Sequence, residues 1–131
     1  RGGINQGAWR VAGIERDGPA ALARVTSRLR NTPELAFEDR RDILTALTVT
    51  GTARPDLRPA IVPALIETVE RHPEHAGDIA YSFYAWRDWS IVPLFSAMLD
   101  GALDHDTRYI LDIVVATARA EHPEMPAAED L

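Results

Sequence analysis

Ile61-Val62-Pro63 is repeated 30 residues later as Ile91-Val92-Pro93. The match continues along the chain at the same offset, where mostly apolar or identical residues coincide: Leu65 with Phe95, Val69 with Leu99, His75 with His105, Ile79 with Tyr109, and Phe83 with Ile113. A fixed period of roughly 20–50 residues is typical of proteins built from stacked supersecondary units. The pattern therefore predicts a repeat architecture, and such scaffolds usually bind along an extended surface.

The segments between prolines and glycines follow the helical period, and none shows the alternation of a strand. We expect helices over residues 4–16, 19–30, 33–51, 55–71, 75–87, 89–99 and 105–120. Thr32 is predicted to cap the third of these, and Pro63 to kink the fourth. The fold class expected is all-α, with an α-solenoid-like stack of about three antiparallel helix pairs. Residues 1–131 are expected to form one domain, with 1–17 a weak N-terminal helix and 121–131 an acidic, ragged tail.

The amino-acid composition excludes some classes of function and disfavours others. The 131 residues are 46% hydrophobic and 26% charged, contain no Cys, and carry a net charge of −6, which disfavours sequence-independent binding of nucleic acid. All cations are arginine, so lysine chemistry is excluded. No apolar run approaches the roughly 20 residues of a membrane helix, and the absence of cysteine suits a cytosolic protein, so we expect a cytoplasmic protein without membrane contact.

Three units of the chain carry a family resemblance, the first of them, Pro19 to Thr50, only by its helix lengths and by Asp39-Arg40-Arg41. Residues 90–99 resemble the first helix of a short, roughly 30-residue HEAT repeat with its internal proline, and Asp104-His105-Asp106-Thr107-Arg108 resembles the start of the second. Residues 59–66 match a first helix as well, but in the second helix of that unit Asp78 occupies the position that corresponds to Arg108. The resemblance implies a curved stack of helix pairs that binds a macromolecule. It implies no catalytic residue and no cofactor.

Histidines provide the first candidate for chemistry. His72, His75 and His105 fall in expected turns, and stacking of repeats would bring His75 and His105 to equivalent corners of adjacent units. A metal site there is conceivable, but no His-x-x-x-His or Glu-x-x-His lies on a helix face. We therefore interpret these residues as exposed turn and capping residues and assign no metal site. Templates for nucleophilic catalysis and for phosphate-binding loops are also absent from the sequence, so we expect no enzyme.

An aromatic cluster within residues 81–89 is the better candidate. Phe83 and Trp86 share a helical face with Ile79 and are expected in the core. The remaining members point elsewhere and combine the side chains enriched at binding hot spots. We therefore predict a partner-binding surface made of Tyr81, Tyr84, Arg87 and Trp89.

The expected helix 105–120 is apolar nearly all round. Tyr109, Ile113 and Ala116 form the predicted inward stripe, yet Leu111 and Val115 lie on the other side. Such a helix is usually covered on both faces, either by the tail and the N-terminal block or by another chain, and we favour a homodimer or a larger parent protein.

The function that the sequence favours is a non-enzymatic protein-interaction module with an unidentified protein partner. Two other classes stay open. One is a nucleic-acid binder similar to the HEAT-like DNA-repair glycosylases, which needs one basic face from six arginines: Arg24, Arg28, Arg40, Arg41, Arg54 and Arg58. The other is an all-α domain that encloses an apolar small molecule beside its aromatic cluster.

Overall fold

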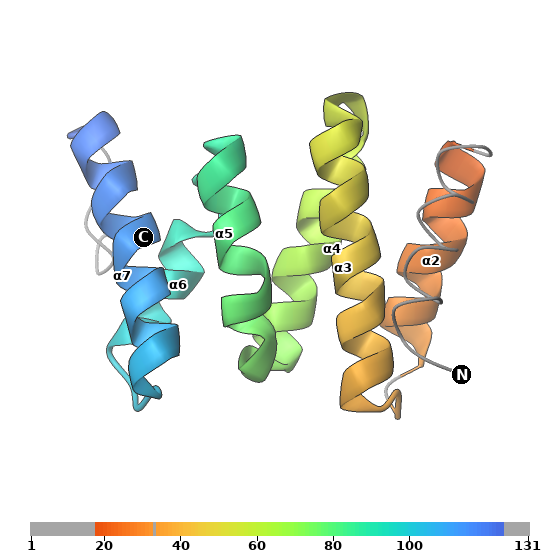
Figure 1. Ribbon diagram of the computed structural model, residues 1–131, viewed down its shortest axis with the longest axis horizontal. Helices are drawn as coiled ribbons and strands as arrows, with labels where there is room; N and C mark the ends of the chain where they lie inside the picture. Colours follow the sequence, from red (N-terminus) through yellow and green to blue (C-terminus); the bar gives the residue numbers. More distant parts are fainter. Residues whose placement is uncertain (1–17, 33, 125–131) are drawn as a thin grey trace. The chain divides into compact units, whose positions relative to one another are not determined.

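The computed structural model describes residues 18–32 and 34–124, and within them the chain forms helices and no strand (Figure 1). The six α-helices are α2 (Pro19–Asn31), α3 (Phe37–Ala53), α4 (Arg58–Arg71), α5 (Ala76–Trp86), α6 (Val92–Leu99) and α7 (His105–Glu121). Short 3-10 helices, η1 (Pro55–Leu57) and η2 (Pro73–His75), precede α4 and α5. The all-α prediction is confirmed. The expected helix 4–16 and residues 125–131 of the expected tail lie outside the described residues.

Prolines set the ends of several helices. Arg54, His72 and His122 each follow a helix directly, precede a proline, and have ψ near 75–80° instead of a helical value. A proline ring clashes with a preceding residue in the α conformation, so the chain must leave the helix at that point. In each case the backbone N–H still donates to the carbonyl four residues back. The sequence pattern thus fixes where α3, α4 and α7 stop.

The start of α3 differs from the prediction. Thr32 ends α2, and α3 begins only at Phe37, after Ala36. The Leu35 carbonyl accepts a hydrogen bond of 2.6 Å from the Arg40 guanidinium, so a side chain satisfies an acceptor that an earlier helix start would have used. The predicted cap at Thr32 is therefore wrong.

The start of α7 is capped. The Asp104 carboxylate accepts hydrogen bonds from the Thr107 hydroxyl (2.7 Å) and backbone N–H (3.0 Å). These bonds hold the pKa of Asp104 below its usual range. A side-chain acceptor of this kind satisfies a donor that the first helical turn leaves unpaired.

Contacts divide the chain into two compact units at the Asp78–Ile79 boundary. In the first unit, α2, α3 and α4 pack against one another. Its core contains fully buried aliphatic side chains, among them Ile43, Leu44, Leu47, Ile61 and Leu65. In the second unit, α6 packs on α7. The buried side chains there include Phe83, Ile91, Phe95, Leu111 and Val114.

The 30-residue period holds for the helices that carry the repeated tripeptide. Ile61, Val62 and Leu65 are buried, and so are their counterparts Ile91, Val92 and Phe95. The two prolines nevertheless differ in position, because Pro63 lies inside α4 whereas Pro93 lies in the first turn of α6. Only Pro63 removes a donor that its helix would use, and α4 continues through it to Arg71.

The period fails for the helices that follow. Ile79 and Phe83 are fully buried, whereas Tyr109 is 64% exposed and Ile113 only half-buried. The reason is that α4 has 14 residues and α6 has 8, and the links after them differ. Because each residue turns a helix by about 100°, equal sequence spacing does not give equal orientation.

The structure shows a different common pattern in α3, α5 and α7. Each of these helices has buried residues at positions i, i+3, i+4 and i+7, as α4 also has: Arg40, Ile43, Leu44, Leu47; Ala76, Ile79, Ala80, Phe83; and Leu111, Val114, Val115, Ala118. The predicted inward stripe of the last helix is therefore wrong. Tyr109 and Ala116 are exposed, and Leu111 and Val115 form the buried side. Whether α7 associates with a second copy stays a prediction.

Candidate interaction surface

The four residues predicted to bind a partner lie together at the end of α5. The Tyr81 and Tyr84 rings stack with centroids 6.2 Å apart, and the Arg87 guanidinium carbon lies 4.7 Å from the centre of the Tyr84 ring and 5.9 Å from that of Trp89. Tyr81 is 68% exposed, Arg87 is exposed, and Tyr84 and Trp89 are half-buried. We call this set the aromatic–arginine surface.

The other aromatic residues of the cluster lie where the helical period placed them, with one difference. Phe83 is fully buried, as predicted, together with Ile79. Trp86 packs on Phe83 at 5.8 Å but is only half-buried. The buried rings thus fix the rotation of α5 and turn Tyr81 outward.

The backbone of Arg87 is unusual. Its φ of 56° lies in the left-handed region, and no other non-glycine among the described residues has a positive φ. The Arg87 N–H donates to the Tyr84 carbonyl and the Asp88 N–H to the Phe83 carbonyl, the paired bonds of a Schellman helix end. Glycine is the usual residue at this position, because a side chain there costs about 1–2 kcal/mol. The chain therefore holds an arginine where a glycine is sterically favoured.

The Arg87 side chain is held by contacts within its own unit. Its Nη1 donates to the Tyr84 carbonyl at 2.8 Å, and its Nε lies 3.2 Å from a carboxylate oxygen of Glu121 at the end of α7. These contacts orient the guanidinium over the two aromatic faces. The arrangement presents a partly apolar surface with a cation in its middle.

A second cluster, which the sequence did not predict, surrounds His75 in the first unit. His75 is fully buried, and its ring stacks on Phe37 with centroids 4.5 Å apart and 12° between the planes. Its Nδ1 lies 3.0 Å from Asp78 Oδ2, and its Nε2 lies 3.3 Å from Arg40 Nη1. The prediction that His75 is an exposed turn residue is wrong, whereas His105, whose side chain is 93% exposed, fits it.

The two hydrogen bonds of His75 fix its tautomer. A guanidinium can only donate, so Nε2 accepts from Arg40 and the Nδ1–H donates to Asp78. Both ring nitrogens are thus occupied and closed to solvent, which leaves neither for proton transfer to a substrate or for a metal. Residues 18–32 and 34–124 contain no group of three or more His, Asp or Glu side chains that could hold a metal ion.

A local signal for the buried histidine existed. His75 lies four residues before Ile79 and eight before Phe83, on the buried side of the helix that follows it. Its partners on α3 could not be read in the same way, because they lie 35 or more positions away. The cluster ties the start of α3 to the turn between α4 and α5.

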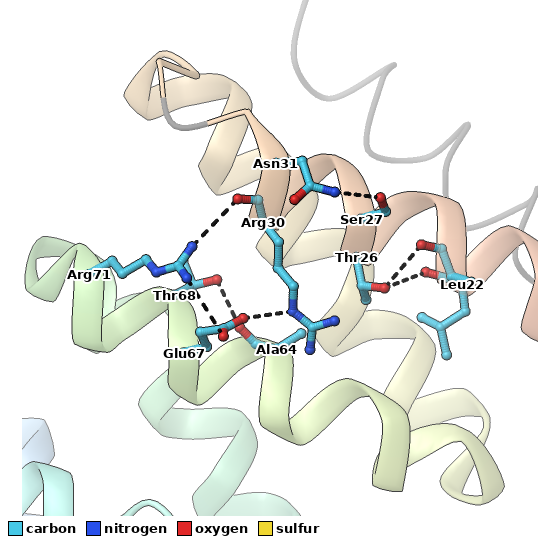
Figure 2. A network of polar contacts seen from close by, with 10 residues as sticks. Leu22, Thr26, Ser27, Arg30, Asn31, Ala64, Glu67, Thr68 and Arg71 are labelled. Atoms are coloured by element: carbon cyan, nitrogen blue, oxygen red, sulfur yellow. Dashed lines mark hydrogen bonds and ion pairs between the residues drawn. The ribbon is translucent and has the colours of Figure 1, made fainter.

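Polar contacts also join α2 to α4 in the first unit (Figure 2). Glu67 pairs with Arg30 at 2.7 Å and with Arg71 at 3.8 Å, and the Arg71 guanidinium reaches the Arg30 carbonyl at 3.5 Å. A small cleft of about 30 Å³ lies beside this network and is bordered by His72. A larger open cleft of about 410 Å³ is lined by residues of α2, η1 and α4, including Leu22, Leu57 and Ala60. Neither cleft is lined by Phe83 or Trp86, beside which a ligand-binding domain was expected to enclose its ligand.

His72 makes the stability of the fold depend on pH. Burial, and then the positive charge of Arg40, lower the pKa of His72 below its ordinary value of 6.5. The unfolded chain therefore binds a proton more readily than the folded chain, and stability falls as the pH drops below about 6.5. We expect urea midpoints to decrease from pH 7.5 to pH 5.5, and to decrease less in His72→Gln. An unchanged slope in His72→Gln would contradict this assignment.

The six arginines named for a nucleic-acid-binding face do not share one environment. Arg40 is buried, with its guanidinium between His75 and the Leu35 carbonyl. Arg41 lies 3.4 Å from Asp78, and Arg54 pairs with Asp56 at 2.9 Å. Arg40 thus cannot contribute to an outer basic face in this structure, and the charges of Arg41 and Arg54 are locally offset.

Comparison with known proteins gives no relative: no family model, no curated protein and no solved structure matches this chain. In the described part of the chain, none of the helices has the length and apolar character needed to cross a membrane. The class that the fold defines is an all-α domain of six described helices.

Proposed function

We propose that the protein is a non-enzymatic interaction module that binds a protein partner through the aromatic–arginine surface. The observation that supports this most strongly is Arg87 in the left-handed conformation. Backbone strain at a position where glycine costs less is often found where a side chain is used for function. Here that side chain stands between Tyr84 and Trp89, in the combination of Tyr, Trp and Arg that is enriched at binding hot spots.

The proposed architecture is a HEAT-like repeat stack of three helix pairs, α2–α3, α4–α5 and α6–α7. The feature that supports it is the shared burial of the repeated tripeptide in α4 and α6; the i, i+3, i+4, i+7 buried pattern of α3, α4, α5 and α7 is consistent with it but is typical of any helix packed on one face. In such stacks each pair buries its apolar side against its neighbours, and one set of helices faces a concave binding side. The aromatic–arginine surface at the end of α5 would then lie at the middle pair.

Arg87→Gly separates binding from stability. Glycine removes the left-handed strain but also an exposed ion pair, so we expect an unfolding free energy within about 1 kcal/mol of the parent. Affinity for the partner should fall at least about tenfold, since the guanidinium is the centre of the surface. The partner is first captured with the tagged protein from extracts of the source organism and identified by mass spectrometry. Purified partner is then titrated calorimetrically against each variant.

Tyr84→Ala and Tyr109→Ala provide the matched pair of controls. Tyr84→Ala should weaken partner binding with little loss of thermal stability, whereas Tyr109→Ala, at an exposed ring outside the aromatic–arginine surface, should bind like the parent. Parent-like affinity of Arg87→Gly and Tyr84→Ala would contradict the proposal. A melting temperature lowered by many degrees in Tyr84→Ala would instead show that this ring belongs to the core.

A further inference from the structure

The second unit has an excess of negative charge that its own arginines do not neutralise. Residues 79–124 contain seven Asp and Glu against three Arg. Among these residues, Glu121 is the one carboxylate paired with an arginine. Arg108 instead donates to the carbonyls of Leu99 and Gly101. An uncompensated negative surface attracts cationic partners and repels acidic ones.

The aromatic–arginine surface has an open end at Tyr81. Its side chains follow one another as ring, ring, guanidinium and ring, from Tyr81 through Tyr84 and Arg87 to Trp89. The Tyr81 ring stacks on Tyr84 and is still 68% exposed, so much of it is accessible to a partner. A cation stacked on the exposed face of Tyr81 would extend this series of stacked groups by one more member.

We propose that this surface binds a basic segment of a protein and that an arginine of that segment stacks on Tyr81. This inference rests on the proposed function and adds the chemistry of the partner. Arginine fits better than lysine because its planar guanidinium stacks on an aromatic face and is less strongly hydrated. An acidic or phosphorylated segment fits less well, since at Arg87 it would meet the carboxylate of Glu121, 3.2 Å from Nε.

Short peptides test the proposal directly. The purified protein is titrated with three peptides in which glycine alternates with arginine, lysine or citrulline, and binding is followed by fluorescence anisotropy. We expect the arginine peptide to bind about fivefold more tightly than the lysine peptide, and the citrulline peptide, which has the shape without the charge, to bind at least about tenfold more weakly than the arginine peptide. Added salt should weaken binding of both charged peptides.

Tyr81→Leu tests whether the Tyr81 ring is the group on which the arginine of the peptide stacks. Leucine keeps an apolar side chain at an exposed site but removes the aromatic face, so the preference for arginine over lysine should disappear while the protein stays folded. Tyr109→Leu, at the other exposed tyrosine of this unit, should retain the preference. Equal affinity of the parent protein for arginine and lysine peptides, or a preference that persists in Tyr81→Leu, would overturn the inference.

The inference and the proposed function can fail separately. Suppose that the native partner no longer binds Arg87→Gly, but that the arginine peptide does not displace this partner from the parent protein. This result would support the proposed interaction surface and overturn the inference of an arginine-bearing segment. Displacement by the arginine peptide, lost in Tyr81→Leu, would support both.

Discussion

Phe83→Ala is expected to lower the free energy of unfolding by about 3–5 kcal/mol, the range for removing a fully buried phenylalanine. The Phe83 side chain is inaccessible to solvent and packs on Trp86. Alanine would leave a cavity that the surrounding side chains fill only in part, so both transfer energy and packing are lost. Folded domains are stable by only about 5–15 kcal/mol, so this single change should shift the urea midpoint strongly.

Tyr81→Ala is the matched control on the same helix. Its ring is 68% exposed and makes one stacking contact, so we expect a change within about 1 kcal/mol. The urea midpoints of the two variants compare the buried and the exposed side of α5, provided that the slope of the unfolding free energy against urea concentration is the same in both. Equal effects of the two substitutions would mean that the rotation of α5 is wrong, and with it the outward direction of the aromatic–arginine surface.

Local sequence patterns were sufficient for the helices. Spacings of three and four and the positions of prolines gave all six described helices with ends close to those observed, because both signals act within one or two turns. The start of α3 was missed, since the Leu35 carbonyl is satisfied by Arg40 from within the helix that follows. That bond depends on how one side chain packs.

The repeat was predicted only in part. The period of 30 locates the buried faces of α4 and α6, but applied to α7 it placed Tyr109 inward, where the structure buries Leu111. A period counted along the sequence assumes equal helix and link lengths. The apolar pattern of α7 alone could not choose between two sides, because both carry aliphatic residues.

The aromatic–arginine surface was likewise predictable from the sequence only in part. The spacing of Tyr81, Tyr84 and Arg87 along one helix was enough to group them. The contact of Arg87 with Trp89 depends on the left-handed backbone at Arg87, which a sequence does not indicate for an arginine. The His75 cluster depends on side chains from α3 and was therefore beyond any local pattern.

His75→Ala is expected to destabilise the protein by about 3 kcal/mol, although the residue is polar. The substitution removes a buried ring stacked on Phe37 and leaves the Arg40 guanidinium without its Nε2 partner, 3.3 Å away. A buried donor left unpaired costs about 1–3 kcal/mol in addition to the lost packing. Thermal and urea unfolding of His75→Ala, Arg40→Met and His75→Phe measures these losses.

Combining the two apolar substitutions shows whether His75 and Arg40 act as a pair. Arg40→Met leaves His75 Nε2 without its donor, and His75→Phe removes the histidine acceptor of Arg40 Nη1, while Nη2 keeps the Leu35 carbonyl, so each substitution alone should destabilise. The double variant removes both polar groups at once and keeps a ring against Phe37, so it should lose less than the sum of the single variants by about 1 kcal/mol or more. Additive losses would mean that the Arg40–His75 hydrogen bond contributes nothing of its own, and that other contacts, such as the ring stack on Phe37 and the Arg41–Asp78 ion pair, hold α3 against the residues around η2.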